Sequence, residues 1–117
     1  PVQLQYMPAE MEFYDSVIEK GLGTATLYYT YRGKVIQYEI YLQYTNGSYS
    51  ISQEDTYKNN YQLWNGKVPI RIKELETINS KEKEFFATFE HQSTLYKLIG
   101  IIEKEEFEKI LKNLYFF

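Results

Sequence analysis

The sequence contains no cysteine, and that absence excludes several kinds of chemistry. Without a thiol the chain forms no disulfide, no thiolate nucleophile and no cysteine-based zinc site. The compartment stays open, because a cysteine-free protein suits both oxidising and reducing surroundings. No apolar run approaches the roughly 18 residues that a membrane span requires. The chain begins at Pro1 with no signal peptide, so we expect part of a longer protein, attached to a membrane only through a segment outside this chain.

Basic stretches are also missing, although the chain is well charged. Its 13 lysines and arginines are scattered among 16 acidic residues, which gives a formal net charge of −3. A nucleic-acid binder needs a basic face to neutralise phosphates. The sequence therefore predicts no nucleic-acid partner.

Aromatic residues are abundant, with 13 Tyr, 7 Phe and 1 Trp among 117 residues. A chain of this length predicts a single domain spanning 1–117. Aromatic and β-branched side chains suit the pleated, half-buried surface of a sheet. The composition therefore favours a fold rich in β-strands.

The clearest strands are marked by side chains that alternate with period two. Residues 24–32 and 35–44 each place apolar or tyrosine side chains on one face and polar ones on the other. Asn46-Gly47 is a strong hairpin signal, since both residues tolerate positive φ. The segment 48–53 is expected to return as the next strand.

The flanking segments predict further strands and one loop. Residues 11–19 are expected to form a first strand. Residues 54–67 are polar and rich in turn residues, so they are expected to form a loop that Trp64 anchors. Residues 68–78 carry an early proline, which favours an edge or irregular strand. Two more strands are predicted at 85–91 and 94–102. The second is apolar on both faces and so is expected to be central.

The end of the chain changes period from two to 3.6. Four apolar residues within 103–114 recur at helical spacing, namely Phe107, Ile110, Leu111 and Leu114. This is an amphipathic helix whose apolar face should pack on the sheet. The final Leu-Tyr-Phe-Phe is expected to dock on the sheet as well.

No catalytic, cofactor or metal residue can be assigned from the pattern. His91 is the only histidine, and Ser93, two residues away on a turn, does not make a triad with it. The acidic groups Glu54-Asp55 and 103–106 lack the spacing of a calcium loop. We therefore expect no enzyme. A hydrolase using paired carboxylates remains an alternative, because residues far apart in sequence can meet.

The tyrosines divide into two groups by the face on which they fall. Those on the apolar faces are expected to be core, namely Tyr29, Tyr31, Tyr38, Tyr44 and Tyr49. Tyr28, Tyr41 and Tyr96 are assigned instead to faces shared with Thr, Gln and Glu. Cross-strand pairing explains them without function. They also predict an exposed aromatic stripe that, with Trp64, binds a peptide, glycan or lipid.

Four segments in order resemble a known family. They are the Tyr-Met-Pro entry (6–8), the hairpin YTNGSYSISQ (44–53), the hairpin EFFATFEHQSTLYKLIG (84–100) and the closing helix EKEEFEKILKNL (103–114). Together they resemble the bacterial domain-of-unknown-function family numbered 4367, common in Firmicutes. The resemblance spans nearly the whole chain.

This resemblance implies a location and a fold. Such domains sit at the outer end of proteins with an N-terminal membrane helix, some of them similar to anti-sigma factors. Their fold is expected to be a curved antiparallel sheet with a helix, similar to lipoprotein-carrier and sigma-regulator sensor domains. The family has no established catalytic residues, so none is transferred to this chain.

The sequence thus predicts an α+β domain, a curved antiparallel sheet of about six strands with a C-terminal helix packed on one face. The leading hypothesis is a non-catalytic extracytoplasmic sensing or binding module of a Gram-positive envelope protein, with a peptide or glycan ligand. The alternative is a structural module that packs on its parent chain or self-associates.

Overall fold

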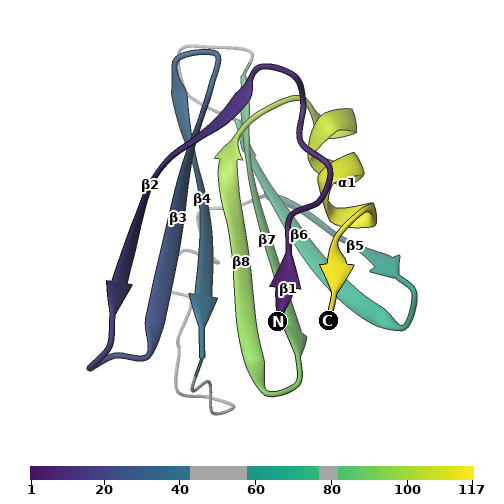
Figure 1. Cartoon of the computed structure of the whole chain (residues 1–117). Helices are drawn as coiled ribbons and strands as arrows, with labels where there is room; N and C mark the ends of the chain where they lie inside the picture. The colour runs from purple at the N-terminus through teal and green to yellow at the C-terminus, as the bar shows by residue number, and fades with distance from the viewer. Residues whose placement is uncertain (43–57, 77–81) are drawn as a thin grey trace.

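A computed structural model describes residues 1–42, 58–76 and 82–117. Its elements are β1 (Val2–Gln3), β2 (Met11–Glu19), β3 (Thr24–Tyr31), β4 (Lys34–Tyr41), β5 (Lys58–Asn65), β6 (Val68–Glu76), β7 (Lys83–His91), β8 (Thr94–Ile101), α1 (Lys104–Lys112) and β9 (Tyr115–Phe116). Seven strands form one sheet in the order β2-β3-β4-β8-β7-β6-β5, and β1 pairs with β9 in a separate ribbon (Figure 1). All strand pairs are antiparallel.

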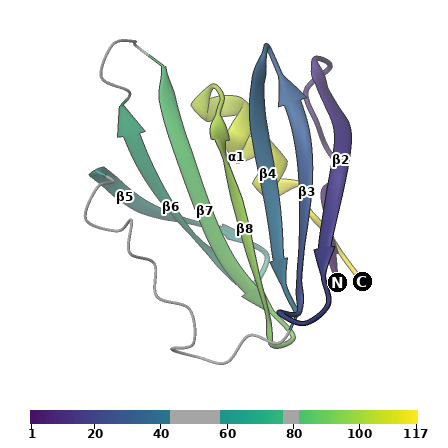
Figure 2. The same cartoon turned by 90° about the vertical axis from the view of Figure 1, so that its left-hand side faces the viewer.

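The large sheet consists of two meanders that meet at its centre. Strands β2, β3 and β4 form one, and β5, β6, β7 and β8 form the other, so β2 and β5 are the two edges (Figure 2). The meanders join where β4 pairs with β8, from Gln37 opposite Ile99 to Tyr41 opposite Leu95. Gly100 extends this seam, and a Cβ there would lie 2.7 Å from Cγ1 of Ile36. A glycine therefore allows the closest approach of the two halves.

The mixed α+β architecture is confirmed, but the strand count and the curvature differ from expectation. The sheet has seven strands rather than six and is not strongly curved. The additional strand is β5, which lies where a loop was predicted at 54–67. Its asparagines and glutamine concealed the alternation, since an edge strand tolerates polar side chains on its exposed side. The described part of the chain places one helix and a short ribbon on the inner face, which gives the sheet little to curve around.

Other strand predictions have mixed outcomes. The prediction that Pro69 puts its strand at an edge is wrong, because β6 pairs with both β5 and β7. Pro69 is tolerated since it lies near the beginning of β6, where ladder bonds are fewest. The central position predicted for 94–102 is confirmed by the pairing of β8 with β4 and β7. The Asn46-Gly47 turn, the strand 48–53, Tyr44 and Tyr49 lie outside the described residues.

The core lies between the inner face of the sheet and α1. Alternate side chains of β3 and β4 point into it, so Tyr29, Tyr31 and Tyr38 are buried as predicted. The ring of Phe85 on β7 stacks on Phe107 of α1 with centroids 5.2 Å apart. Burying such apolar side chains is the main stabilising contribution to the fold.

The C-terminal helix and tail close this core. Phe107, Ile110 and Leu111 are fully buried, which confirms the predicted amphipathic face of α1. The tail then pairs with β1, where Phe116 lies opposite Val2 and packs partly against the core. Within the described ranges, no helix is both long and apolar enough to cross a membrane.

Candidate binding site

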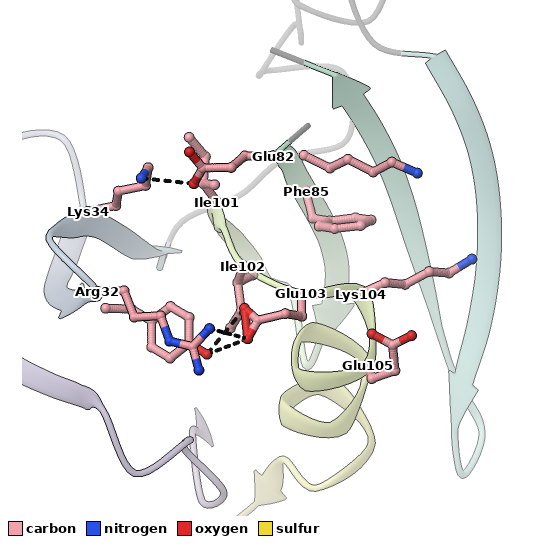
Figure 3. A pocket seen from close by; sticks show the side chains of 11 residues that line it. Arg32, Lys34, Glu82, Phe85, Ile101, Ile102, Glu103, Lys104 and Glu105 are labelled. Atoms are coloured by element: carbon pink, nitrogen blue, oxygen red, sulfur yellow. Dashed lines mark hydrogen bonds and ion pairs between the residues drawn. The ribbon is translucent and has the colours of Figure 1, made fainter. Parts of the chain in front are cut away.

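A cavity opens at the end of the sheet where the β3–β4 turn, the start of β7 and the start of α1 converge (Figure 3). Its volume of about 480 Å³ lies within the range of small-molecule sites. We call it the end cavity. Its lining residues are Tyr31, Arg32, Lys34, Glu82, Lys83, Phe85, Ile101, Ile102, Glu103, Lys104 and Glu105.

The floor of the end cavity is apolar. Phe85 comes from β7, and Ile101 and Ile102 come from the end of β8 and the link to α1. Phe85 is held against the ring of Phe107, so its position is fixed by the packing of the helix. Phe85 and Ile102 are almost completely buried, so the apolar surface that the floor offers comes mainly from the half-buried Ile101.

One side of the rim is a charged network built on the β3–β4 turn. Arg32 and Gly33 both have positive φ, 51° and 78°, as the tight turn between these strands requires. The turn directs Nη1 of Arg32 to Oε1 of Glu103 (3.1 Å), and Nε to Oε2 of Glu10 (3.1 Å). The hydroxyl of Tyr31 donates to the same Glu103 oxygen at 2.6 Å. The turn is thus tied to the residue that precedes α1.

The remaining cations of the rim are also engaged. Nζ of Lys34 lies 2.8 Å from a carboxylate oxygen of Glu82. Lys83 lies 3.4 Å from Glu74, a buried carboxylate on β6. Lys104 lies over the ring of Tyr61, 4.8 Å from its centroid. The rim therefore alternates in sign and is mostly neutralised by its own pairs.

The environment shifts the pKa values of the Tyr31–Glu103 pair apart. Burial, and then the adjacent Glu103 carboxylate, raise the pKa of Tyr31 to about 12. The pKa of Glu103 is lowered, first by the hydrogen bond from Tyr31 and further by the Arg32 guanidinium. At neutral pH, Tyr31 is therefore a hydrogen-bond donor and Glu103 an ionised acceptor.

The described lining of the end cavity consists of apolar side chains, charged side chains and one tyrosine. Among the residues that the structure describes, the lining of the end cavity contains no serine, threonine or histidine, and the chain has no cysteine. A general acid needs a raised carboxyl pKa, whereas that of Glu103 is lowered. Among the residues that the structure describes, no cluster of histidine and carboxylate side chains is placed to hold a metal ion.

The aromatic residues predicted as a binding stripe are placed apart from the end cavity. Tyr28 is half-buried on the outer face of β3, where its ring lies 6.0 Å from that of Tyr14. Tyr41 lies on the outer face of β4, with Nζ of Lys97 at 4.6 Å from its ring centroid. Partial burial lowers the pKa of Lys97. The binding role of Tyr28 and Tyr41 stays a prediction.

The other two members of that stripe have different surroundings. Trp64 is 57% exposed on β5 and is a strand residue rather than a loop anchor. The prediction that Tyr96 lies on a polar face is wrong: it is 2% exposed and stacks on Tyr38 and Phe89 in the core. Its strand is apolar on both faces, so the pattern did not show which face was inside.

His91 is also remote from the end cavity. It ends β7, at the end of the strand opposite to Lys83, and contacts Phe116 edge-on at 5.0 Å between ring centroids. Its surroundings are those of a packed residue at a turn.

Sequence reasoning missed the end cavity because its parts come from three separate segments. A signal was nevertheless present in the charged residues at strand ends. In a meander, the end of one strand and the start of the next lie at the same edge. The charges of 32–34, 82–83 and 103–105 therefore belong to one end of the sheet once its strands are aligned.

Comparisons with known proteins identify a family but no characterised relative. No curated protein and no solved structure matches the chain. The model of the domain of unknown function DUF4367 matches residues 1–114, almost the whole sequence. The chain therefore belongs to the DUF4367 family.

Proposed function

We propose that this domain is a non-catalytic binding module that holds its ligand in the end cavity. The observation that carries the proposal is an apolar floor enclosed by charged pairs. In the described part of the lining the one hydroxyl is that of Tyr31, and it is engaged by Glu103. Apolar surface provides affinity, and a few fixed polar groups provide orientation. Binding by these two kinds of contact does not require a catalytic side chain.

The ligand class follows from the lining. An apolar side chain would pack on Ile101, and charges of both signs would face the rim, which carries Arg32 and Lys34 beside Glu103 and Glu105. A short peptide with one central apolar residue between a basic and an acidic one has these properties. A nucleotide or a sugar phosphate has a single sign of charge and matches the rim less well.

A titration with peptides tests this proposal. The probes are tripeptides with Leu, Phe or Tyr between Lys and Glu, with triglycine as the control. Amide chemical shifts should change at Gly33, Phe85 and Lys104 with the apolar peptides only. The variant Ile101→Lys should weaken binding by about tenfold or more, because a charge then occupies the floor.

Ile99→Lys is the matched control, since Ile99 is also a half-buried residue of β8 but does not line the end cavity. It should bind as the wild type does. Equal loss in the two variants, or no localised shifts with any peptide of the panel, would show that the end cavity is not the site.

We also propose that the domain acts outside the cytoplasm, as a sensing or binding part of an envelope protein. This location is suggested by its family alone. Protease treatment of intact cells expressing the tagged full-length protein tests the location. Cleavage of the tag before lysis supports it, and protection until lysis contradicts it.

A further inference from the structure

The edge strand β2 exposes an unusual amount of apolar surface. Within the described residues it pairs only with β3, and no described strand lies on its other side. Large apolar side chains are more than 40% exposed along it and in the turn that follows, namely Phe13, Tyr14, Val17, Ile18 and Leu22. Large apolar side chains that are exposed together on one element are typical of an interaction site.

Some of the usual protections of an edge are missing from β2, although acidic side chains and a bulge are present. Edge strands are commonly short, carry lysine or proline, or lie under a covering element. β2 has nine residues and contains neither proline nor lysine. A bulge between Phe13 and Asp15 interrupts the ladder, but pairing is regular from Asp15 to Glu19. This half of β2 is a straight, accessible template for another strand.

The charge on β2 is of one sign. Glu12, Asp15 and Glu19 are exposed, and the strand contains no cation. Ser16 donates its backbone N–H to Oδ1 of Asp15 at 2.8 Å in an exposed position. One backbone donor of β2 is therefore directed at a carboxylate on the edge itself. An incoming strand therefore meets negative charge along this edge.

The two faces of β2 differ in character beyond the bulge. Ser16 and Ile18 lie opposite Leu27 and Ala25, on the inner face that also carries Tyr29. Asp15, Val17 and Glu19 lie on the outer face. A strand added at this edge would contact apolar surface on the inner side and two carboxylates on the outer side.

We propose that β2 docks an extended segment of a partner protein as an eighth strand, with apolar residues on its inner face and lysine or arginine on its outer face. Main-chain hydrogen bonds would supply affinity, and the alternating side chains would supply specificity. Charge complementarity favours this occupant over a second copy. Pairing of β2 with itself would gather six carboxylates, with Lys20 in the adjacent turn as the nearest cation of each chain. This site is separate from the end cavity.

Fluorescence anisotropy with labelled peptides tests the proposal. The probe is a blocked heptapeptide in which Val and Lys alternate, and the control replaces each Lys by Glu. The lysine peptide should bind and the glutamate peptide should not. Affinity should fall with added salt, because exposed charge pairs are screened.

Two kinds of variant locate the binding. Ser16→Pro removes an N–H that is directed at Asp15, and its ring obstructs the edge, so binding should be lost. The double variant D15K/E19K should weaken binding of the lysine peptide by about tenfold or more, because two attractions become repulsions. The matched control E76K/E90K reverses two exposed glutamates on β6 and β7 and should bind normally.

Thermal melting of each variant shows whether it is folded, and D15K/E19K tests the charge pattern even where S16P does not fold. Equal binding of both peptides, or wild-type binding by D15K/E19K, would overturn the proposal. Concentration-dependent dimerisation in sedimentation, abolished by D15K/E19K or S16P, would also overturn it, by making a second copy the occupant.

Discussion

The two edges of the sheet, β2 and β5, differ in their contacts with α1 and in their exposed side chains. At β5, Tyr61 donates to Glu108 of α1 at 2.8 Å, and Asn65 donates to the carbonyl of Leu111 at 2.9 Å. Its exposed positions include Asn59, Asn60 and Gln62. At β2 no comparable tie to α1 is seen among the described residues, and the exposed side chains are mostly apolar or acidic. A single helix covers one edge and leaves the other available.

The difference shows that an open edge is not a general weakness of this fold. The chain places polar side chains and helix contacts where pairing must be prevented. It places apolar residues with acidic neighbours where pairing is selective. This contrast is the basis of our proposal that β2 binds a partner strand.

The largest effect on stability is expected from truncating Phe107, which packs α1 against the sheet. Phe107→Ala deletes a fully buried ring stacked on Phe85 and should cost about 3–5 kcal/mol of unfolding free energy. Phe13→Ala on β2, where the ring is 55% exposed, should cost about 1 kcal/mol or less. Urea unfolding measures both. Hydrogen exchange should show that β5 loses protection in the first variant, and similar costs for the two would contradict the comparison.

A smaller effect is expected at the seam between the two meanders. Gly100→Ala places a Cβ 2.7 Å from Cγ1 of Ile36 and 3.3 Å from its Cα, so the strands must separate. Overpacking of this kind costs about 1–3 kcal/mol. Both edges should lose hydrogen-exchange protection together, because the seam joins the halves that carry them. Gly21→Ala, which meets nothing within 4 Å, is the control. Loss confined to one edge would mean that the halves are independent.

The smallest effect on stability appears only at alkaline pH and concerns Tyr61 of the edge strand β5. Burial first, and then the hydrogen bond to Glu108, raise the pKa of Tyr61 above that of an unfolded tyrosine, which is about 10. The folded state therefore holds this proton more tightly. Its contribution to stability is complete below pH 10 or so and is lost as pH rises towards the folded pKa.

Urea midpoints measured across this pH range should fall more steeply for the wild type than for Tyr61→Phe. Glu108→Gln keeps a hydrogen-bond acceptor but removes the charge, and so should give an intermediate slope. Identical slopes in all three proteins would show that the Tyr61–Glu108 tie is not formed in solution.

The sequence predicts those parts of the fold in which one residue's environment follows from its immediate neighbours. Alternation in 24–32 and 35–44 identified β3 and β4 and the burial of Tyr29 and Tyr38. The 3.6-residue period identified α1. Both patterns are local, so neither depends on knowing which strands become neighbours.

The features that the sequence did not predict depend on non-local pairing. β5 was missed because its side chains are polar, and Tyr96 was assigned to the wrong face because β8 is apolar on both. The end cavity joins the β3–β4 turn to residues about 50 and 70 positions later. Only the order of strands in the sheet brings those charges together.

The pairing of β4 with β8 also has a consequence for how the chain folds. Each meander consists of hairpins between consecutive strands, which close short loops and form quickly. The seam instead joins residues such as Gln37 and Ile99, 62 positions apart. Closing a loop of that length has a larger entropic cost, and contacts of high sequence separation slow folding. We therefore expect the two meanders to form first, and their junction at Ile36 and Gly100 to set the folding rate.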